Sequence, residues 1–538
     1  MGAHMATVTY SFPGGVYPNQ YNPPLVDIDY NASFGELVDM STATRLSTST
    51  TQVVFGLGNG LKLKLVGTGF AFDANGHAVG GTVSSIQILQ NNGTTLVQAI
   101  SGLSVSLELF QDAAIGFDNW GLEDWLFNRA DTFNGSAGDD SMEGRSGNDI
   151  LNGNGGDDFI TGGEGDDTYN GGAGFDVLSF QDAYYTPEAF RGVNLNATTG
   201  IVSDPYGFSE TFTSFEQFRG TQFADILTGS AVDEEFMGLG GRDTINGGGG
   251  IDAVRYDRDV DRGGNAGVNV NLTTGVAKDG FGSQDTLTSI EDVRGTIFAD
   301  TIVGSSAANF LRGGAGNDSI NGAGGSDEMR GGQGNDTYFV NSTGDIVDES
   351  ADGGAGADTV RSFISFNLSS ATAVRGSVEH LALLGTSNIS GTGNSLNNIL
   401  SGNSGNNGLN GAAGNDLING GLGNDSLTGS TGLDTFFFNT ALNATTNVDT
   451  INSFIVADDT IRLENAIFSA ILGTGTLTAA QFVKNTTGLA ADANDRIIYE
   501  SDTGKLLYDS NGNAAGGSVH FATIGTNLAL TAADFFIV

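Results

Sequence analysis

The sequence predicts an all-β protein whose central part is a parallel β-solenoid. Three observations lead to this prediction. Glycine and aspartate recur in a nine-residue frame through much of the chain, a longer segment occurs twice, and the first hundred or so residues alternate apolar with polar side chains. A fixed period indicates stacked repeat units, and alternation indicates strands with one buried face.

The region before the repeats predicts a β-sandwich-like domain over residues 6–118, after a tag remnant at residues 1–5. Apolar and polar residues alternate in LKLKLV (61–66) and GTVSSIQILQ (81–90), and turn signals follow at residues 73–76 and 91–93. In residues 119–130, Leu122, Trp125 and Leu126 share one helical face. We expect a short helix there that caps the open end of the solenoid.

The nine-residue frame is clearest from Gly135 to Ser179, which divides into GSAGDDSME, GRSGNDILN, GNGGDDFIT, GGEGDDTYN and GGAGFDVLS. Glycine holds the first and fourth places, aspartate the sixth, and a large apolar residue the eighth. The frame returns in three later blocks. Together with the spacers, the predicted parts are 131–185, 186–260, 261–345 and 346–437, followed by a C-terminal β-rich module at 438–538.

This spacing has a physical reason. Glycines permit the positive φ of a tight turn, which brings backbone carbonyl oxygens together, and the aspartate adds the charged oxygen that a hard cation prefers. The apolar residue two places later lies on a short strand whose side chain joins a narrow core. Asn309, Asn398 and Asn407 hold the aspartate place at block edges. We expect fewer or weaker ions there.

The spacers carry a repeat of their own. The segment that begins GVNLNATTG at Gly192 recurs as GVNVNLTTG at Gly267. Val268, Val270 and Leu272 alternate with polar residues, which predicts strands. The solenoid is therefore expected to continue between the blocks.

The charge composition narrows the classes of partner that the protein can bind. Lys plus Arg number 21 against 63 Asp plus Glu, a net charge of −42. This excludes an electrostatic footprint for nucleic acid or anionic lipid. The chain has no cysteine, no apolar run of membrane-spanning length and no N-terminal signal peptide after the tag remnant.

The repeats resemble the RTX family, whose calcium-binding nonapeptide is GGxGxDxUx. The resemblance implies a parallel β-roll in which Ca²⁺ lies between turns one coil, eighteen residues, apart. Asp140 and Asp158 would then share one side of the roll, and Asp149 and Asp167 the other. The predicted calcium ligands, together with turn carbonyls, are Asp140, Asp149, Asp158, Asp167, Asp176, Asp225, Asp243, Asp252, Asp300, Asp318, Asp327, Asp336, Asp358, Asp416, Asp425 and Asp434.

The C-terminal module resembles that of serralysin-like RTX exoproteins, with a DTFFF opening and the ending Asp534 to Val538. The resemblance implies export by type I secretion machinery through an uncleaved C-terminal signal, and hence a secreted, extracellular protein. A final core strand is the alternative interpretation of that ending.

A search for catalytic motifs leaves the function open. HExxH and GxSxG are absent, which disfavours a zinc protease and a lipase with a nucleophile elbow. Asp27, Asp29, Glu36 and Asp39 are candidates for a carboxylate pair. The leading hypothesis is a non-enzymatic adhesin or matrix protein that binds a glycan or cell surface. The alternatives are a polysaccharide hydrolase or lyase that uses those carboxylates, and a self-assembling surface-layer subunit.

Overall fold

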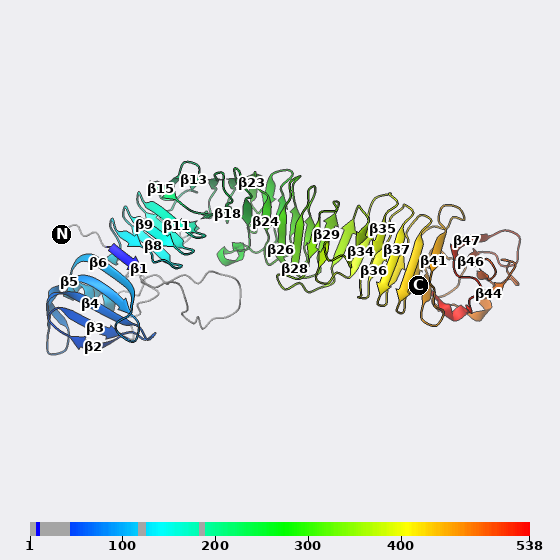
Figure 1. Cartoon of the computed structure of the whole chain (residues 1–538), viewed down its shortest axis with the longest axis horizontal. Coiled ribbons are helices and arrows are strands. Elements are labelled where there is room, and N and C mark those ends of the chain that lie inside the picture. The colour runs from blue at the N-terminus through cyan, green and yellow to red at the C-terminus, as the bar shows by residue number, and fades with distance from the viewer. Residues whose placement is uncertain (1–6, 11–42, 117–124, 182–188) are drawn as a thin grey trace. The chain divides into compact units, whose positions relative to one another are not determined.

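The structure is a computed structural model that describes residues 7–10, 43–116, 125–181 and 189–538. Its chain divides into two compact units, Met1–Gly264 with Gly275–Ile290, and Asn265–Thr274 with Glu291–Val538. Strands dominate both units (Figure 1). Within the described residues, no helix is long and apolar enough to cross a membrane.

The N-terminal domain contains one antiparallel sheet in the order β2-β3-β4-β5-β6-β1. Helix α2 packs on β5 and β6, and the core includes Leu63, Ile86 and Phe110. Its elements are β1 (Thr7–Tyr10), β2 (Thr44–Thr48), β3 (Gln52–Gly56), β4 (Lys62–Phe72), β5 (Ala78–Leu89), β6 (Leu96–Ser106) and α2 (Leu107–Gly116).

This domain differs in detail from the predicted sandwich. The described residues give one sheet with a helix packed on it, and the sequence analysis did not anticipate α2. Half of the expected capping helix at 119–130, residues 119–124, lies outside the described residues. Strand β1 pairs with β6 and, in parallel, with the first roll strand β7, so the domain sheet continues into the roll.

The roll of the first unit has two parallel sheets that receive successive strands alternately. One contains β7, β9 and β11, and the other contains β8, β10 and β12. Its elements are β7 (Thr132–Asn134), β8 (Ser141–Ser146), β9 (Ile150–Gly155), β10 (Phe159–Glu164), β11 (Thr168–Ala173), β12 (Val177–Ser179), β13 (Asn194–Asn196), β14 (Ile201–Ser203), β15 (Ser209–Thr213), β16 (Gln217–Arg219), β17 (Ile226–Thr228), β18 (Glu235–Met237), β19 (Thr244–Asn246), β20 (Ala253–Arg255), η2 (Asp259–Arg262), β22 (Val276–Lys278) and β23 (Gln284–Thr288).

The register of these strands confirms the predicted coil. Met142 pairs with Ile160, and Leu151 pairs with Tyr169, so equivalent residues lie eighteen positions apart. These eighth-place side chains are buried and stack along the interior. The spacers also form strands, with antiparallel pairs β13–β14 and β22–β23, which confirms that the solenoid continues through them.

The second unit continues the same architecture. Its roll elements are β21 (Asn269–Asn271), β24 (Asp292–Arg294), β25 (Thr301–Val303), β26 (Phe310–Ala315), β27 (Ser319–Asn321), β28 (Glu328–Gln333), β29 (Thr337–Val340), β30 (Ile346–Asp348), β31 (Thr359–Ser362), β32 (Phe366–Asn367), β33 (Val374–Arg375), β34 (His380–Leu383), β35 (Ser390–Thr392), β36 (Ile399–Ser401), β37 (Gly408–Ala413), β38 (Leu417–Asn419), β39 (Ser426–Thr431) and β40 (Thr435–Phe438). Parallel pairs such as Ser319 with Thr337 keep the eighteen-residue register.

The C-terminal module closes this unit with β41 (Asp449–Asn452), β42 (Thr460–Leu463), β43 (Gly475–Thr476), η3 (Ala479–Gln481), β44 (Phe482–Asn485), β45 (Ile497–Glu500), β46 (Lys505–Asp509), β47 (Ser518–Thr523), η4 (Ala532–Asp534) and β48 (Phe535–Ile537). Strand β48 pairs in parallel with β42, and Phe535 and Ile537 are buried. The ending therefore forms a core strand. Its role in secretion stays a prediction.

Candidate calcium-binding turns

The aspartates of the roll form two hydrogen-bonded ladders, one along each side. Asp140 N–H donates to Asp158 Oδ1 at 2.8 Å, and Asp149 N–H donates to Asp167 Oδ1 at 2.7 Å. Each step spans eighteen positions, which agrees with the predicted division of these aspartates between two sides. One carboxylate oxygen of each aspartate accepts this bond. What each turn can bind therefore depends on whether a protein donor also reaches the second oxygen.

In one class of turn the second oxygen is buried, yet no donor among the described residues reaches it. It lies against the first glycine of its repeat, where a Cβ on Gly153 would stand 2.0 Å from Asp158 Oδ2 and 2.2 Å from the Gly171 carbonyl oxygen. Carboxylate and carbonyl oxygens thus meet where only glycine fits. Aspartates whose Oδ2 has this environment are Asp149, Asp158, Asp176, Asp243, Asp318, Asp327, Asp336, Asp416, Asp425 and Asp434.

These turns, which we call open turns, share a backbone feature. The residue four places before each of these aspartates has a positive φ, including non-glycine residues such as Arg145 (76°), Ala323 (63°) and Ser430 (82°). A positive φ is costly for an L-residue, so its recurrence indicates a constraint of the turn. Asp252 follows the same rule, with Gly248 at 100°. The Asp167 Oδ2 differs because it accepts from the Tyr169 hydroxyl at 3.3 Å.

In a second class, the capped turns, a backbone N–H of the protein donates to the second carboxylate oxygen, Oδ2. The residue four places earlier has an ordinary φ, and its N–H donates to Oδ2: Ser136 to Asp140 at 2.5 Å, Thr221 to Asp225 at 2.7 Å, and Thr296 to Asp300 at 2.6 Å. The sequence analysis treated these three aspartates like the others. The structure separates them, because a cation there would have to compete with an existing donor.

Asparagine turns satisfy the site with an amide instead. Asn309 Nδ2 donates to the Glu291 carbonyl oxygen at 2.6 Å, and Asn407 Nδ2 donates to the Ile389 carbonyl oxygen at 2.9 Å. Asn398 makes the equivalent bond to Glu379 at 3.0 Å. The amide group therefore reaches the carbonyl oxygens of the neighbouring coil without a cation, which supports the expectation of fewer or weaker ions at these places.

Several aspartates of the open turns also have a raised pKa. Burial, with smaller contributions from neighbouring carboxylates, raises the pKa of Asp149, Asp158 and Asp318 to about 8. Burial and the adjacent Asp225 raise the pKa of Asp243 to about 10. Buried carboxylates without a counter-charge favour either a proton or a bound cation. An all-oxygen environment of carboxylates and carbonyls suits Ca²⁺.

The structure adds acidic residues that the sequence analysis missed. Asp449 and Asp459 lie beyond the last repeat, yet they accept the N–H of Asp425 and Asp434 at 3.0 and 3.1 Å and so extend the ladders. In the spacer, Asp285 accepts the Asp243 N–H at 3.0 Å. The duplicated segment carried a signal for this, because it places Asp285 where its first copy has Glu210.

The N-terminal carboxylate candidates all fall in a part of the sequence that the structure does not describe. Asp27, Asp29, Glu36 and Asp39 lie outside the described residues.

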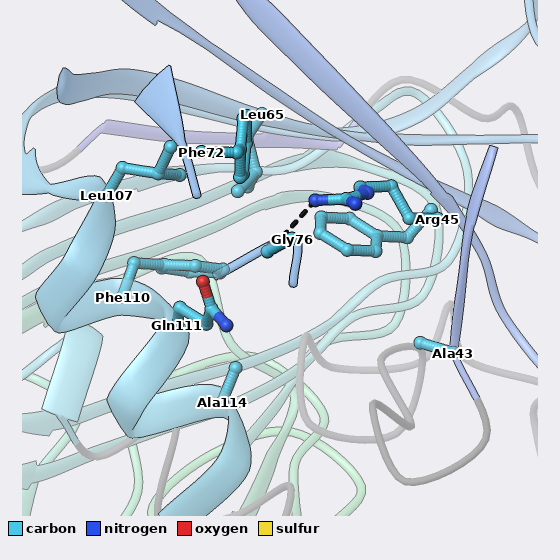
Figure 2. A pocket seen from close by; sticks show the side chains of 10 residues that line it. Ala43, Arg45, Leu65, Phe72, Gly76, Leu107, Phe110, Gln111 and Ala114 are labelled. Carbon is cyan, nitrogen blue, oxygen red and sulfur yellow. Dashed lines mark hydrogen bonds between the residues drawn. The ribbon is translucent and has the colours of Figure 1, made fainter. Parts of the chain in front are cut away.

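A cavity of about 290 Å³ lies between the sheet and α2, lined mainly by apolar side chains (Figure 2). At its edge, the Arg45 guanidinium lies 4.9 Å from the Phe72 ring centroid and donates to the Gly76 carbonyl oxygen at 2.7 Å.

One protein family matches the segments that contain the open turns. The family of the RTX calcium-binding nonapeptide repeat (4 copies) matches residues 127–160, 143–178, 219–254, 228–261, 294–329, 303–338 and 392–437. Over these residues the chain is similar to the RTX calcium-binding repeats. They bind calcium, and with the two parallel sheets they form the RTX β-roll. The matches include every aspartate of the open turns and leave Asp358 outside.

The comparisons with curated proteins and with solved structures give little further information. No curated protein matches the chain. Among solved structures, an extracellular lipase, LipA from Serratia marcescens, is similar with 14% sequence identity over 76% of this chain and a TM-score of 0.15. The match spans 40% of the length of that lipase.

Proposed function

We propose that this protein is a secreted, calcium-dependent adhesin or matrix protein. In this proposal an RTX roll folds outside the cell and presents the N-terminal β-domain to a polysaccharide or a cell surface. The observation that carries the proposal is the row of buried aspartate oxygens in the open turns, which no protein donor satisfies. Such a row makes the folded roll dependent on a cation along its length.

This dependence suits export. Extracellular calcium modules work at about 0.1–1 mM calcium, far above cytosolic concentrations. At low calcium, a chain of net charge −42 with buried carboxylates is destabilised by self-repulsion and desolvation. Calcium binds the folded state selectively and stabilises it in proportion to the logarithm of its free concentration. An exported chain would therefore fold where calcium is abundant.

The N-terminal domain is the proposed binding module. Outside the roll, its cavity combines an apolar lining with one guanidinium at the edge. A sugar ring presents both an apolar face and hydroxyl groups, so aromatic and guanidinium groups together suit it. Type I secretion by way of the C-terminal module belongs to the same proposal.

The test is an array of bacterial and plant polysaccharides, probed with the full chain in millimolar calcium and in chelator. Calcium-dependent retention of unaltered polysaccharide would support the proposal, and Arg45→Ala should weaken it more than the control Lys62→Ala. Shortened or unsaturated products would instead identify a hydrolase or lyase. Calcium-triggered growth of sheets or filaments in light scattering, without glycan retention, would identify a surface-layer subunit.

A further inference from the structure

One coil of the second unit departs from the nonapeptide frame. The Asp336 N–H donates to Asp358 Oδ1 at 2.8 Å across 22 positions, whereas consecutive nonapeptide coils, such as that from Asp318 to Asp336, close this bond across 18. The register is still eighteen at β30, where Met329 pairs with Val347, so the four additional residues lie between β30 and β31. This segment brings a glutamate, Glu349, into the interior of the roll.

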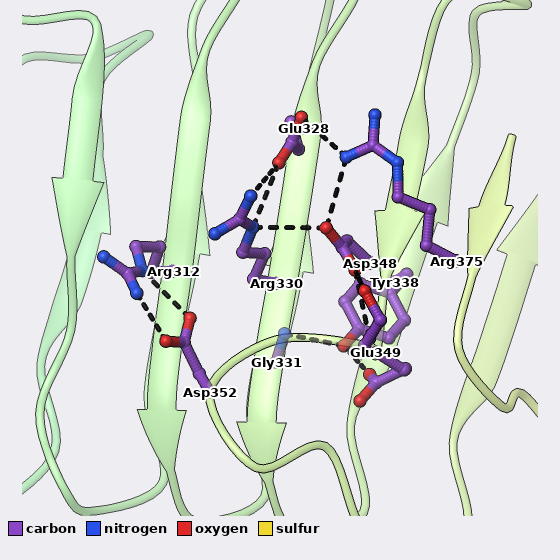
Figure 3. Close-up of polar contacts among 10 residues, drawn as sticks. Arg312, Glu328, Arg330, Gly331, Tyr338, Asp348, Glu349, Asp352 and Arg375 are labelled. Atoms are coloured by element: carbon purple, nitrogen blue, oxygen red, sulfur yellow. Dashed lines mark hydrogen bonds and ion pairs between the residues drawn. The ribbon is translucent and has the colours of Figure 1, made fainter. Parts of the chain in front are cut away.

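Glu349 faces the two aspartates that flank this coil. One carboxylate oxygen from each of Asp336, Glu349 and Asp358 lies within 4.8 Å of the others. Glu349 Oε1 accepts from the Tyr338 hydroxyl, and that hydroxyl accepts from the Gly331 N–H at 2.7 Å (Figure 3). Three buried carboxylates therefore share a space at the end of the third block.

The remaining oxygens point to a ligand. Asp336 is 1% exposed and Glu349 is 4% exposed, yet Asp336 Oδ2 and Glu349 Oε2 have no hydrogen-bond partner in the part of the chain that the structure describes. Within the described residues, no ion pair reaches Glu349. Leaving charged oxygens buried and unsatisfied is costly, and a cation between them removes that cost.

Neighbouring arginines hold the segment but do not neutralise this cluster. Asp348 Oδ2 pairs with Arg330 at 3.5 Å and with Arg375 at 3.2 Å (Figure 3). Asp352 pairs with Arg312 at 2.5 Å. These contacts fix the residues on both sides of Glu349, so its carboxylate is positioned before any ion arrives.

The second turn of this coil, before Asp358, differs from an open turn, and Glu349 supplies the oxygen that this turn lacks. Gly354, four places before Asp358, lacks the positive φ of the open turns. A Cβ on Gly354 would stand 2.8 Å from Glu349 Oε2, so the glutamate occupies the space beside this glycine. Glu349 thus supplies an oxygen where an open turn would direct carbonyl oxygens.

We propose that Asp336, Glu349 and Asp358 form a three-carboxylate calcium site that binds Ca²⁺ more tightly than the sites between open turns and fills first. Calcium affinity rises with the number of charged ligands and with the rigidity of the site. Both are greater here, because Tyr338 and the flanking ion pairs orient Glu349. The proposal rests on calcium binding by the repeats and is independent of any adhesin role.

The experiment is a calcium titration of the calcium-depleted full chain against a chromophoric chelator, which resolves the tightest site. We expect Glu349→Gln, which keeps the size of the side chain, to weaken the tightest step by about tenfold or more. The control Glu464→Gln alters a partly exposed glutamate outside the ladders and should leave this step unchanged. An unaltered tightest step in Glu349→Gln, with the chain folded, would overturn the proposal.

A second measurement applies if Glu349→Gln does not fold. Tb³⁺ takes the oxygen ligands of Ca²⁺ and emits when a nearby tyrosine is excited. The first equivalent added to the full chain should emit through Tyr338, and Tyr338→Phe should remove most of that emission. Full emission from the first equivalent in Tyr338→Phe would place the first ion elsewhere and contradict the proposal.

Discussion

The open turns and the asparagine turns occupy equivalent places in the roll but complete their sites differently. At Asp318 the second carboxylate oxygen has no donor, whereas at Asn309 the amide donates to the Glu291 carbonyl oxygen at 2.6 Å. Both residues donate the same ladder bond, from their backbone N–H to the aspartate Oδ1 of the next coil. An amide therefore supplies, within the chain, a donor in place of the positive charge that calcium supplies from solution.

The backbone differs along with the side chain. Gly314, four places before Asp318, has a φ of 112°, while Ser305, four places before Asn309, has an ordinary φ and donates its N–H to Asn309 Oδ1 at 2.7 Å. Calcium dependence is therefore set by the turn as well as by the aspartate. The capped turns at Asp225 and Asp300 show that aspartate alone does not make an open turn.

The largest expected effect comes from pH in the absence of calcium. In the folded roll, burial raises the pKa of Asp149, Asp158 and Asp318 to about 8, above the ordinary value of 3.8. The stability from their protonation is fully present below the unfolded pKa and is lost as pH rises through the folded pKa. In chelator, the far-UV circular dichroism of the full chain should therefore show more strand at about pH 5 than at about pH 9.

Protonation of these aspartates competes with calcium binding. With calcium present, lowering the pH across this window should raise the calcium concentration at the folding midpoint, because protons and ions compete for the same oxygens. A calcium midpoint that stays constant across this range, or a chelated chain with no more strand at acid pH, would contradict the pKa directions.

The next largest effect separates the two kinds of turn by substitution. Asp318→Ala removes a charged ligand, so the free energy of unfolding should rise less steeply with the logarithm of calcium concentration. Asn309→Ala leaves the Glu291 carbonyl oxygen without its donor and should cost about 1–3 kcal/mol at every calcium concentration. Denaturant unfolding at several calcium concentrations measures both. Equal calcium slopes in the two variants would remove the distinction between the turns.

A smaller effect is expected when the aspartate of an open turn is replaced by asparagine. Asp318→Asn should weaken calcium stabilisation as Asp318→Ala does. At the lowest calcium that still supports folding, it should be more stable than Asp318→Ala by about 1 kcal/mol, because its amide can donate to a neighbouring carbonyl oxygen. The same unfolding series provides the comparison. Identical stabilities of the two variants at low calcium would show that the amide does not substitute for the ion.

The smallest effect concerns the backbone of the open turn. Ala412 has a φ of 78°, so Ala412→Gly should relieve left-handed strain and stabilise the roll by about 0.5 kcal/mol. The adjacent Ala413 has an ordinary φ, and Ala413→Gly should destabilise by a similar amount. Thermal unfolding in calcium measures the two signs, and a destabilising Ala412→Gly would argue against the strain.

Much of the roll could be predicted from the sequence, because its period fixes both the turn and the strand. The glycines, the sixth-place aspartate and the eighth-place apolar residue predicted parallel coils of eighteen residues, and the pairing of Met142 with Ile160 confirms them. The division into open and capped turns was not predicted. It depends on the φ of a residue such as Ser136 or Ala323, which the glycine pattern alone does not reveal.

The acidic residues outside the repeats were missed for a different reason. Asp449 reaches its ladder only because the coil before it is longer than eighteen residues, and Glu349 directly follows β30, beyond the third nonapeptide block, so a fixed frame passes over both. The duplicated spacer did hold the information for Asp285, since its first copy has an acidic residue at the same place. In the N-terminal domain, the cavity beneath α2 depends on long-range packing that alternation of apolar residues does not encode.

The most direct test of calcium-dependent folding is far-UV circular dichroism of the full chain during a calcium titration from chelator to millimolar calcium at neutral pH. The open turns predict that the strand signal is largely absent in chelator and appears as calcium is added. The same strand signal in chelator and in millimolar calcium would contradict the account, because the buried oxygens would then be satisfied without the ion.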